Sequence, residues 1–303
     1  MAKHLAIHSV NRFVYSVPDL AVAEKFYSAF GLEVKRNGKT LDLYTFGNPH
    51  CWASLREGGK LKKFEYLSLG IFAEDLPQFE KLVTKGKPHS LSDGKGLWTR
   101  NPDGVPVQFV VAPKVSPSAK CKPVLESAPL PGKGAAPSRS KARQVRPRAL
   151  SHVLFFTPDV PRMVKWCEDV LGMRVSDKSL DVVAFLHGAH GSDHHLIAFA
   201  KSNAPGLHHS SWDVGSLDEV GRGSEQMRNA GYAKGWGVGR HVLGSNYFYY
   251  VRDPWGSHAE YSFDIDYVPA GLDWPAGDHP PEDSLYVWGP SLPEDFVQNF
   301  EAA

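Results

Sequence analysis

A strand, a Pro-Asp dipeptide and a helix follow one another twice in the 303-residue chain, and this repeat restricts the fold more than any other feature. The segment VNRFVYSVPDL near the N-terminus matches LSHVLFFTPDV near the middle. In each copy an amphipathic stretch follows and ends at a glycine, Gly31 or Gly172, which is typical of a helix. Short alternating strands, a second helix (74–83 or 217–230) and a closing strand pair come next. We therefore predict an α+β fold of duplicated βαβββ modules, with two modules in each of two tandem domains.

A segment of distinct composition connects the two copies. Residues 113–148 are rich in Pro, Ala, Ser, Lys and Arg and lack periodicity, so we predict a linker that is partly mobile. Residues 1–112 then form an N-terminal domain, and residues 149–303 form a C-terminal domain with a Pro-rich extension. The basic residues of the linker leave a nucleic-acid-binding or surface-binding segment as a less favoured alternative to a solvated connector.

Charge and hydropathy exclude several classes of protein. The formal net charge of +1 predicts neither a nucleic-acid-binding nor a membrane-binding surface. No apolar stretch reaches the roughly 20 residues that a membrane-spanning helix needs, and the first residues lack the pattern of a signal peptide. The three cysteines, Cys51, Cys121 and Cys167, are scattered and predict a reducing environment rather than a disulfide framework. We expect a cytoplasmic protein.

Two histidines and one glutamate are candidates for a metal site. His152, His209 and Glu260 lie in three separate strand-like segments, and Glu260 sits in an aromatic-rich stretch where burying an unpaired carboxylate would be costly. Two imidazoles and one carboxylate with open coordination positions form the set that binds non-haem Fe(II). The same ligands also suit Zn(II), Mn(II) or Ni(II), so ligand type alone does not identify the metal.

The first copy provides an internal comparison. Alignment of the two halves places Arg12 opposite His152, Ser68 opposite His209 and Gln108 opposite Glu260. A single strand histidine is more often structural than metal-binding, but three ligand-type residues that are all replaced in the other copy favour a metal site. We therefore predict that the second half carries the active site and that the first half does not bind metal.

The motifs SHVLFFTPD, DHHLIAF, LHHSSWDV, GRH and YYVRDPWGSHAEY resemble those of type I extradiol ring-cleavage dioxygenases of the vicinal oxygen chelate superfamily. The chain is similar to the 2,3-dihydroxybiphenyl and catechol 2,3-dioxygenases over both halves, with a longer linker. The resemblance implies Fe(II), with Mn(II) as an alternative, held by His152, His209 and Glu260. It also implies a catechol and O2 as small-molecule substrates, and a homo-oligomer.

The same resemblance implies three catalytic residues around the metal: His195, His241 and Tyr250. Tyr250 would hydrogen-bond one substrate oxygen, and His241 would hold the other hydroxyl or the surrounding hydrogen-bond network. His195 would face the oxygen-binding position and transfer a proton.

Further aromatic side chains are candidates for the substrate pocket. We expect Phe185 and Trp212, together with Trp236, either to wall the pocket or to pack in the core. Strand alternation predicts that His194 and His208 point away from their neighbours, although His208 is also a candidate for the rim of the substrate pocket.

The predicted function is Fe(II)-dependent extradiol (meta) cleavage of a catechol, which yields a product of the 2-hydroxymuconic semialdehyde type. One alternative is a metal-dependent isomerase or epimerase of the same superfamily, which would draw ligands from both modules; Arg12 and Gln108 disfavour that arrangement. The other alternative is a ligand-binding module without catalysis, which the retained acid–base residues disfavour.

Overall fold

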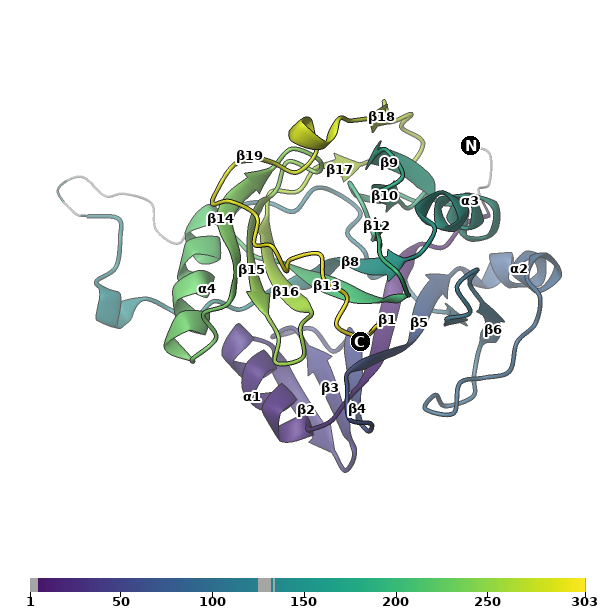
Figure 1. Cartoon of the computed structure of the whole chain (residues 1–303), viewed down its shortest axis with the longest axis horizontal. Helices are drawn as coiled ribbons and strands as arrows, with labels where there is room; N and C mark the ends of the chain where they lie inside the picture. Colours follow the sequence, from purple (N-terminus) through teal and green to yellow (C-terminus); the bar gives the residue numbers. More distant parts are fainter. Residues whose placement is uncertain (1–4, 125–131, 133, 303) are drawn as a thin grey trace.

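The computed structural model describes residues 5–124, 132 and 134–302, and its strands form two large sheets, one from each half of the chain (Figure 1). A small third sheet pairs β11 (Ser192–Asp193) with β17 (Tyr267–Val268). None of the helices within the described residues is both long and apolar enough to cross a membrane. The α+β class expected from the repeat is confirmed.

The first half forms a seven-stranded sheet in the order β2-β3-β4-β1-β5-β7-β6. Its elements are β1 (Ser9–Val17), α1 (Leu20–Phe30), β2 (Glu33–Asn37), β3 (Thr40–Tyr44), β4 (Ala53–Glu57), β5 (Lys63–Ile71), η1 (Ala73–Asp75), α2 (Leu76–Leu82), β6 (Leu97–Arg100) and β7 (Pro106–Val111). The first unit is the expected βαβββ. The second is βαββ, because the Gly-, Pro- and Ser-containing residues 84–96 form a loop instead of a strand.

The second half forms a ten-stranded sheet in the order β18-β9-β10-β12-β8-β13-β16-β15-β14-β19. Its elements are β8 (Ala149–Thr157), α3 (Val160–Leu171), β9 (Arg174–Ser179), β10 (Val183–His187), β12 (Ile197–Lys201), β13 (Gly206–Asp213), α4 (Leu217–Asn229), β14 (Gly235–His241), β15 (Tyr247–Arg252), β16 (His258–Phe263), β18 (Gly277–Asp278), η3 (Pro281–Asp283) and β19 (Tyr286–Trp288). The Pro-rich extension thus supplies both edge strands.

The Pro-Asp and glycine signals mark the ends of α1 and α3, as the repeat predicts. Asp19 and Asp159 are the N-terminal caps, and their carboxylates accept backbone N–H groups of the first turn. Gly31 and Gly172 end the helices with φ of 100° and 64°. A Cβ at Gly172 would lie 2.1 Å from the carbonyl oxygen of Leu5, so this helix end also fits closely against the first half.

The two halves pack against each other through helices and buried polar pairs. In Figure 1, α1 lies beside α4. The rings of Phe30, in α1, and Tyr261 stack with their centroids 4.0 Å apart. The Tyr261 hydroxyl also donates to the carbonyl oxygen of Phe30. Lys62 and Asp253, one from each half, form a buried ion pair with Nζ and Oδ2 2.7 Å apart. These contacts give the second sheet a fixed support.

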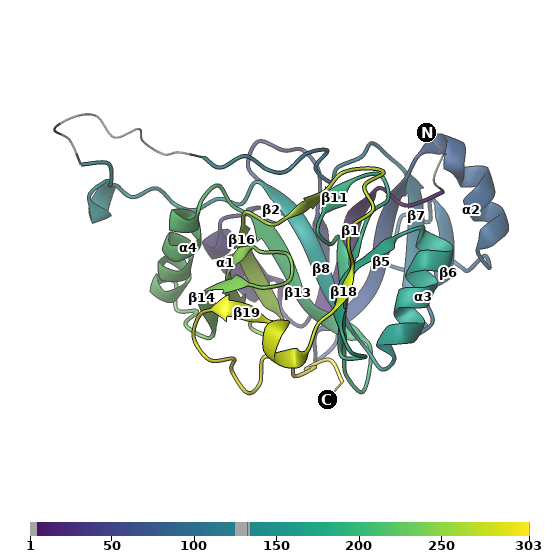
Figure 2. The ribbon, with the colours of Figure 1, turned by 90° about the horizontal axis from the view of Figure 1, so that it is seen from above.

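The described part of the linker runs outside the sheets, and Figure 2 shows the segment with η2 (Arg139–Lys141) standing off beyond α4. Its two ends lie close to the sheets: the N–H groups of Val115 and Ser116 bind Ser9 Oγ, and Val145 is fully buried. The predicted mobility of the linker concerns in part residues 125–131 and 133, which lie outside the described residues.

Strand register shows how the halves correspond. Neighbouring strands align Arg12, Ser68 and Gln108 in the first sheet, and His152, Ser211 and Glu260 in the second. The expected match of Ser68 with His209 is therefore wrong, because Ser68 corresponds to Ser211. His209 pairs with Leu154 just as Tyr66 pairs with Val14, so Tyr66 is its counterpart. Tyr66 and Ser68 are two residues apart and so lie on the same face of β5. An alignment that is wrong by two residues therefore keeps the same alternating pattern, and the pattern did not reveal the mistake.

Candidate metal centre and active site

Three adjacent strands bring His152, His209 and Glu260 together. β8, β13 and β16 lie side by side, and one ligand atom from each residue lies within 4.8 Å of the others. Glu260 Oε2 is 3.3 Å from His152 Nε2 and 3.7 Å from His209 Nε2. All three side chains are buried, and Glu260 is fully inaccessible to solvent. The predicted trio therefore forms one compact cluster of ligand-type atoms.

The orientation of His152 tests whether this cluster fits a cation. Ser151 Oγ donates to the Asp193 carboxylate (2.7 Å), so it accepts the Nδ1–H of His152 (3.2 Å). The Nε2 lone pair of a neutral His152 then points at Glu260 Oε2, which is also an acceptor. Two buried acceptors facing each other repel unless a positive charge lies between them. A seryl–carboxylate support of this kind is typical of the outer sphere of metal-binding histidines.

Two further observations agree with a cation site. His209 Nε2 and Glu260 Oε2 are buried and have no hydrogen-bond partner within the described part of the chain. Burial lowers the pKa of both His152 and His209. An ionised carboxylate beside two neutral imidazoles is the protonation state that metal binding requires.

His241 and Tyr250 form a hydrogen-bonded pair at one side of the cluster. His241 Nδ1 donates to the carbonyl oxygen of Leu285 (2.8 Å), and its Nε2 accepts from the Tyr250 hydroxyl (2.9 Å). Burial raises the pKa of Tyr250 well above its ordinary value, so the phenol stays protonated. Asn246, which the motifs did not indicate, donates to Glu260 Oε1 at 3.1 Å. Its position after the Leu243-Gly244 turn, rather than in a strand, left no periodic signal.

His195 lies next to the cluster of His152, His209 and Glu260, and its ring centroid is 4.0 Å from that of His152. Its Nδ1 is 3.1 Å from Nδ1 of His194, and His194 Nε2 is 2.9 Å from Asp177 Oδ2. His194, unlike His195, is absent from the lining of the cavity described below, so it does not face that cavity. Both histidines precede β12, in a loop where strand alternation does not apply.

A cavity of about 350 Å³ opens onto these residues. His208, Phe185 and Trp236 line it, along with the metal-type histidines and Tyr250. Trp212 is absent from this lining. The prediction that it helps to form the wall of the substrate pocket is therefore wrong, and Trp212 is a core residue. Its indole N–H donates to Ser210 Oγ, and its ring is fully buried in the main core. His208 reaches the cavity because it occupies an irregularity in the β8–β13 register.

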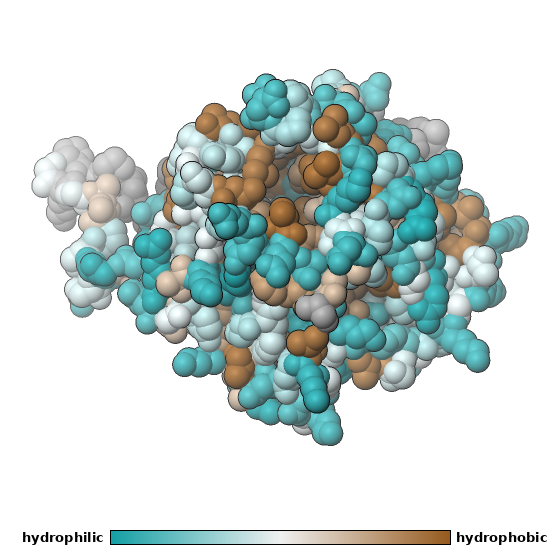
Figure 3. Space-filling view, in the orientation of Figure 1, coloured by the Kyte–Doolittle hydropathy of each residue, from teal (hydrophilic) through white to brown (hydrophobic). Residues whose placement is uncertain are grey.

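Most of the cavity wall is apolar. In Figure 3 a hollow edged by hydrophobic side chains opens in the upper half of the view. Among the lining residues given by the structure are Leu154, Val182, Val183, Leu285, Leu292 and Val297. Lys201 is the only lysine or arginine in this described lining, and it forms an ion pair with Asp181 at the surface. The cavity therefore favours a ligand with an uncharged, apolar body and a polar end that faces the histidines.

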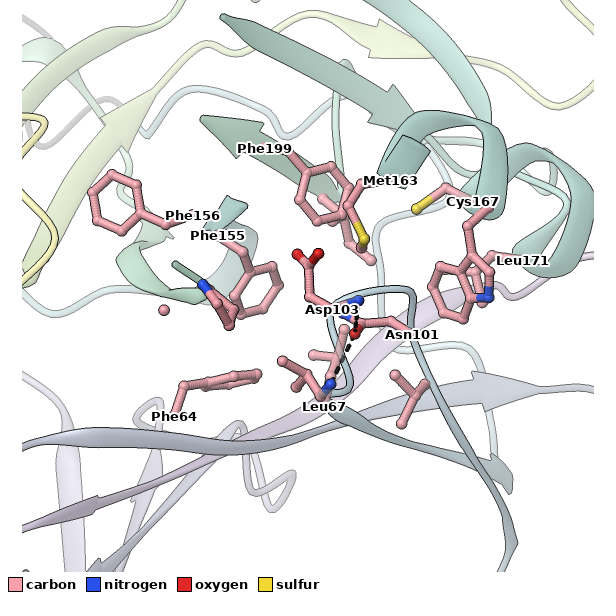
Figure 4. Close-up of a pocket in the computed structure, with 16 residues that line it drawn as sticks. Phe64, Leu67, Asn101, Asp103, Phe155, Phe156, Met163, Cys167, Leu171 and Phe199 are labelled. Carbon is pink, nitrogen blue, oxygen red and sulfur yellow. Dashed lines mark hydrogen bonds between the residues drawn. The ribbon is translucent and has the colours of Figure 1, made fainter. Parts of the chain in front are cut away.

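A second cavity lies between the two halves (Figure 4). Its volume is about 30 Å³, which is too small for an aromatic ring. Phe64, Phe155 and Phe199 surround it, while Asp103 accepts hydrogen bonds from Thr157 and Arg162. This space belongs to the packing between the halves, and the larger cavity remains the candidate active site.

Comparison with known proteins matches residues 149–261 to the Glyoxalase/Bleomycin resistance protein/Dioxygenase superfamily. The chain is 51% identical over 302 residues to metapyrocatechase 2 of Cupriavidus necator, covering 98% of this chain and 93% of that protein. It is 24% identical over 290 residues to a manganese-dependent 2,3-dihydroxybiphenyl 1,2-dioxygenase of Geobacillus genomosp. 3, covering 88% and 89%. The fold resembles 2,2',3-trihydroxybiphenyl 1,2-dioxygenase of Sphingomonas wittichii strain RW1, with a TM-score of 0.72, 16% identity and coverage of 95% and 100%.

Proposed function

The chain belongs to the extradiol ring-cleavage dioxygenases of the glyoxalase and dioxygenase superfamily, and we propose that it uses Fe(II) to open a catechol ring that carries an apolar substituent. It is a metal-dependent enzyme that acts on an aromatic diol and O2. Both oxygen atoms enter the product, which is of the 2-hydroxymuconic semialdehyde type. The metal assignment rests on two buried hydrogen-bond acceptors that face each other, His152 Nε2 and Glu260 Oε2. Beside them, His209 Nε2 has no hydrogen-bond partner among the described residues.

The proposed metal ligands are His152, His209 and Glu260. When bound, Fe(II) would supply a Lewis acid that lowers the pKa of a catechol hydroxyl and a redox centre that activates O2. Mn(II) fits the same donors and is the alternative. The buried, water-poor position of Glu260 strengthens every charge interaction at this centre.

The Tyr250–His241 pair is proposed to hold the substrate. The protonated phenol of Tyr250 donates a hydrogen bond, and a catechol oxygen entering the cavity can take the place of His241 Nε2 as its acceptor. His241 itself stays fixed by the carbonyl of Leu285. Together they would orient the diol against the metal ligands, which replaces a random encounter with a positioned one.

His195 is proposed as the acid–base residue. Because Asp177 accepts the Nε2–H of His194, the Nδ1 of a neutral His194 accepts the Nδ1–H of His195. This leaves His195 Nε2 able to accept a proton from a substrate hydroxyl. Burial, followed by the neighbouring imidazoles, lowers the pKa of His195, so it begins the reaction neutral and can return the proton later.

The apolar wall supports the substrate class. A carboxylate-bearing catechol would meet no unpaired cation in the described lining, whereas an alkyl or aryl group would remove apolar surface from water. A cavity of about 350 Å³ has room for a mono- or bicyclic catechol. Phe185 and His208 are proposed to contact the substituent or to form the rim of the pocket around it.

Several organisational features also belong to this proposal. Residues 1–112 would act as a supporting domain and residues 149–303 as the catalytic domain, joined by the linker at 113–148. We further propose a cytoplasmic homo-oligomer that binds neither nucleic acid nor membranes. The isomerase and binding-module alternatives gain no support from the first half, where Arg12, Tyr66 and Gln108 stand at the positions of the three ligands.

The proposed function is tested by oxygen uptake after anaerobic loading with Fe(II). With 3-methylcatechol or 2,3-dihydroxybiphenyl, one O2 should be consumed for each yellow ring-opened product. A carboxylated catechol should give a kcat/KM at least about 10-fold lower, because its charge loses solvation without gaining a partner. Glu260→Gln should abolish uptake, and Gln108→Glu, the matched change in the first half, should leave it unaltered. Metal-loaded protein that consumes no O2 with any catechol would refute the proposal.

A further inference from the structure

The last residues of the chain form part of the active-site wall. The C-terminal strap, defined as residues 295–301, places Phe296 and Val297 in the cavity lining. Polar contacts hold the strap at both ends and in the middle: Asp295 with Arg252, Asn299 with the carbonyl of Ala204, and Glu301 with the N–H groups of Phe64 and Leu207. The strap is thus tied to both halves of the protein and has a defined position over the site.

A short series of hydrogen bonds connects the strap to a metal ligand. His208 Nε2 is 2.9 Å from the carbonyl oxygen of Phe296, and His208 Nδ1 is 2.7 Å from His209 Nδ1. A carbonyl can only accept, so His208 carries its proton on Nε2. The Nδ1 of a neutral His208 is therefore an acceptor, and the proton between the two rings belongs to His209 Nδ1. His209 Nε2 is then left without a proton, and it is the buried atom that faces Glu260.

The direction of these bonds has an energetic consequence. If the strap moved away, His208 could adopt either tautomer, and the one with Nδ1–H would no longer accept from His209. His209 would then lose its fixed orientation and the bond that favours a bare Nε2, which is the form a metal requires. Metal binding in turn favours the tautomer of His209 that needs His208 as an acceptor. Two events that favour the same arrangement stabilise each other.

We propose that His208 is a positioning residue that couples the C-terminal strap to the metal centre, so that metal binding and strap closure reinforce each other. This inference rests on the proposed function, because it takes His209 as a metal ligand. It gives His208 a role that needs no contact with substrate, and it makes the wall of the substrate cavity dependent on metal occupancy.

Packing alone is the competing explanation for His208. Its ring lies against Phe156, Phe296 and His258, with centroids 5.0, 4.8 and 5.5 Å away. His208→Phe retains an aromatic ring but removes the acceptor and the donor. His208→Gln retains one amide N–H for Phe296 and one carbonyl oxygen for His209 Nδ1–H. His258→Phe is the matched control, because His258 packs on the same strap residue and its Nδ1 has no hydrogen-bond partner among the described residues.

The first test is the affinity of the metal-free full chain for Mn(II), measured by competition with a chelator. Loss of an outer-sphere partner typically weakens metal binding about 10- to 100-fold, and this loss is expected for His208→Phe. His208→Gln should recover most of it, and His258→Phe should bind like the wild type. Wild-type affinity in His208→Phe, or equal loss in the Phe and Gln variants, would overturn the inference and leave the proposed function standing. A wild-type chain that binds neither Mn(II) nor Fe(II) would overturn both.

The second test begins with the wild-type chain, and this first measurement does not depend on how a variant folds. Amide hydrogen exchange of residues 295–301 should slow when Mn(II) is added, while exchange of α1, which belongs to the first half, should not change. In His208→Phe the metal should no longer slow exchange in the strap. If Mn(II) bound the wild type without any effect on exchange of the strap, the coupling would be disproved.

Discussion

At the residue scale, hydrogen-bond direction determines what each histidine of the site can do. Carbonyl and carboxylate oxygens only accept, so Leu285 sets the tautomer of His241, and the Asp193–Ser151 pair sets that of His152. These partners decide which ring nitrogen faces the cavity. The sequence motifs supplied the ligand types, but Leu285 and Asp193 lie 44 and 42 residues from the groups that they bind, so neither carries a spacing signal.

Ser151→Ala should weaken metal binding without altering the three ligands themselves. The change removes the acceptor of His152 Nδ1–H and leaves the buried Asp193 carboxylate without its donor. We expect about 10-fold weaker Mn(II) affinity by chelator competition. Ser54→Ala, a buried serine in the first sheet, is the control. Equal affinities in Ser151→Ala and the wild type would argue against the outer-sphere role.

His187 should make the stability of the protein depend on pH. Burial, followed by the charges of His194 and Arg174, lowers its pKa to about 4. Between pH 6.5 and 4 the unfolded chain therefore takes up a proton that the folded chain excludes, and stability falls as the pH is lowered. This residue contributes a slope of up to about 1.4 kcal/mol per pH unit. His187→Gln should flatten the slope by that amount in denaturant titrations from pH 7 to 4, and an unchanged slope would contradict the assignment.

At the element scale, the ends of helices were predictable and the registers of strands were not. Asp159 and Gly172 mark α3 through local chemistry that any chain with these residues would show. Register depends on irregularities such as the one at His208 in β13, which follow from packing between distant strands. The match of His209 with Ser68 failed because an offset of two residues keeps the same strand face, and alternation does not apply to His194, which lies in a loop before β12.

Gly172→Ala should destabilise the fold. The added Cβ would clash with the carbonyl of Leu5 and would force a side chain into a left-handed conformation. We expect the free energy of unfolding to fall by about 2–4 kcal/mol in urea titrations. Gly221→Ala lies within α4 with open space around it, and should be neutral or stabilising by up to about 1 kcal/mol. Similar effects for the two changes would refute the role assigned to the helix end.

At the scale of the whole molecule, the first half supports the second through buried contacts. Lys62 ties the first sheet to Asp253, which shapes the turn between β15 and the ligand-bearing β16 by accepting the N–H groups of Trp255 and Ser257. The duplicated modules were evident in the sequence. How the halves pack was not, because Lys62 and Asp253 are 191 residues apart and each resembles an ordinary surface charge.

Lys62→Met should reveal how much the second half depends on this contact. The substitution leaves the Asp253 carboxylate buried without its cation, which typically costs about 3–5 kcal/mol. Lys62→Met combined with Asp253→Asn should be less destabilised than the single variant. Thermal and urea unfolding would measure both. Additive losses would show that the two side chains act independently.

The central claim is that His152, His209 and Glu260 hold one metal ion. The most direct measurement is anomalous X-ray diffraction from crystals loaded anaerobically with Fe(II), recorded on both sides of the iron absorption edge. The account predicts one strong anomalous peak per chain, within bonding distance of His152 Nε2, His209 Nε2 and a Glu260 carboxylate oxygen. A peak bound elsewhere, or a fully loaded protein in which Glu260 makes no contact with the iron, would contradict it.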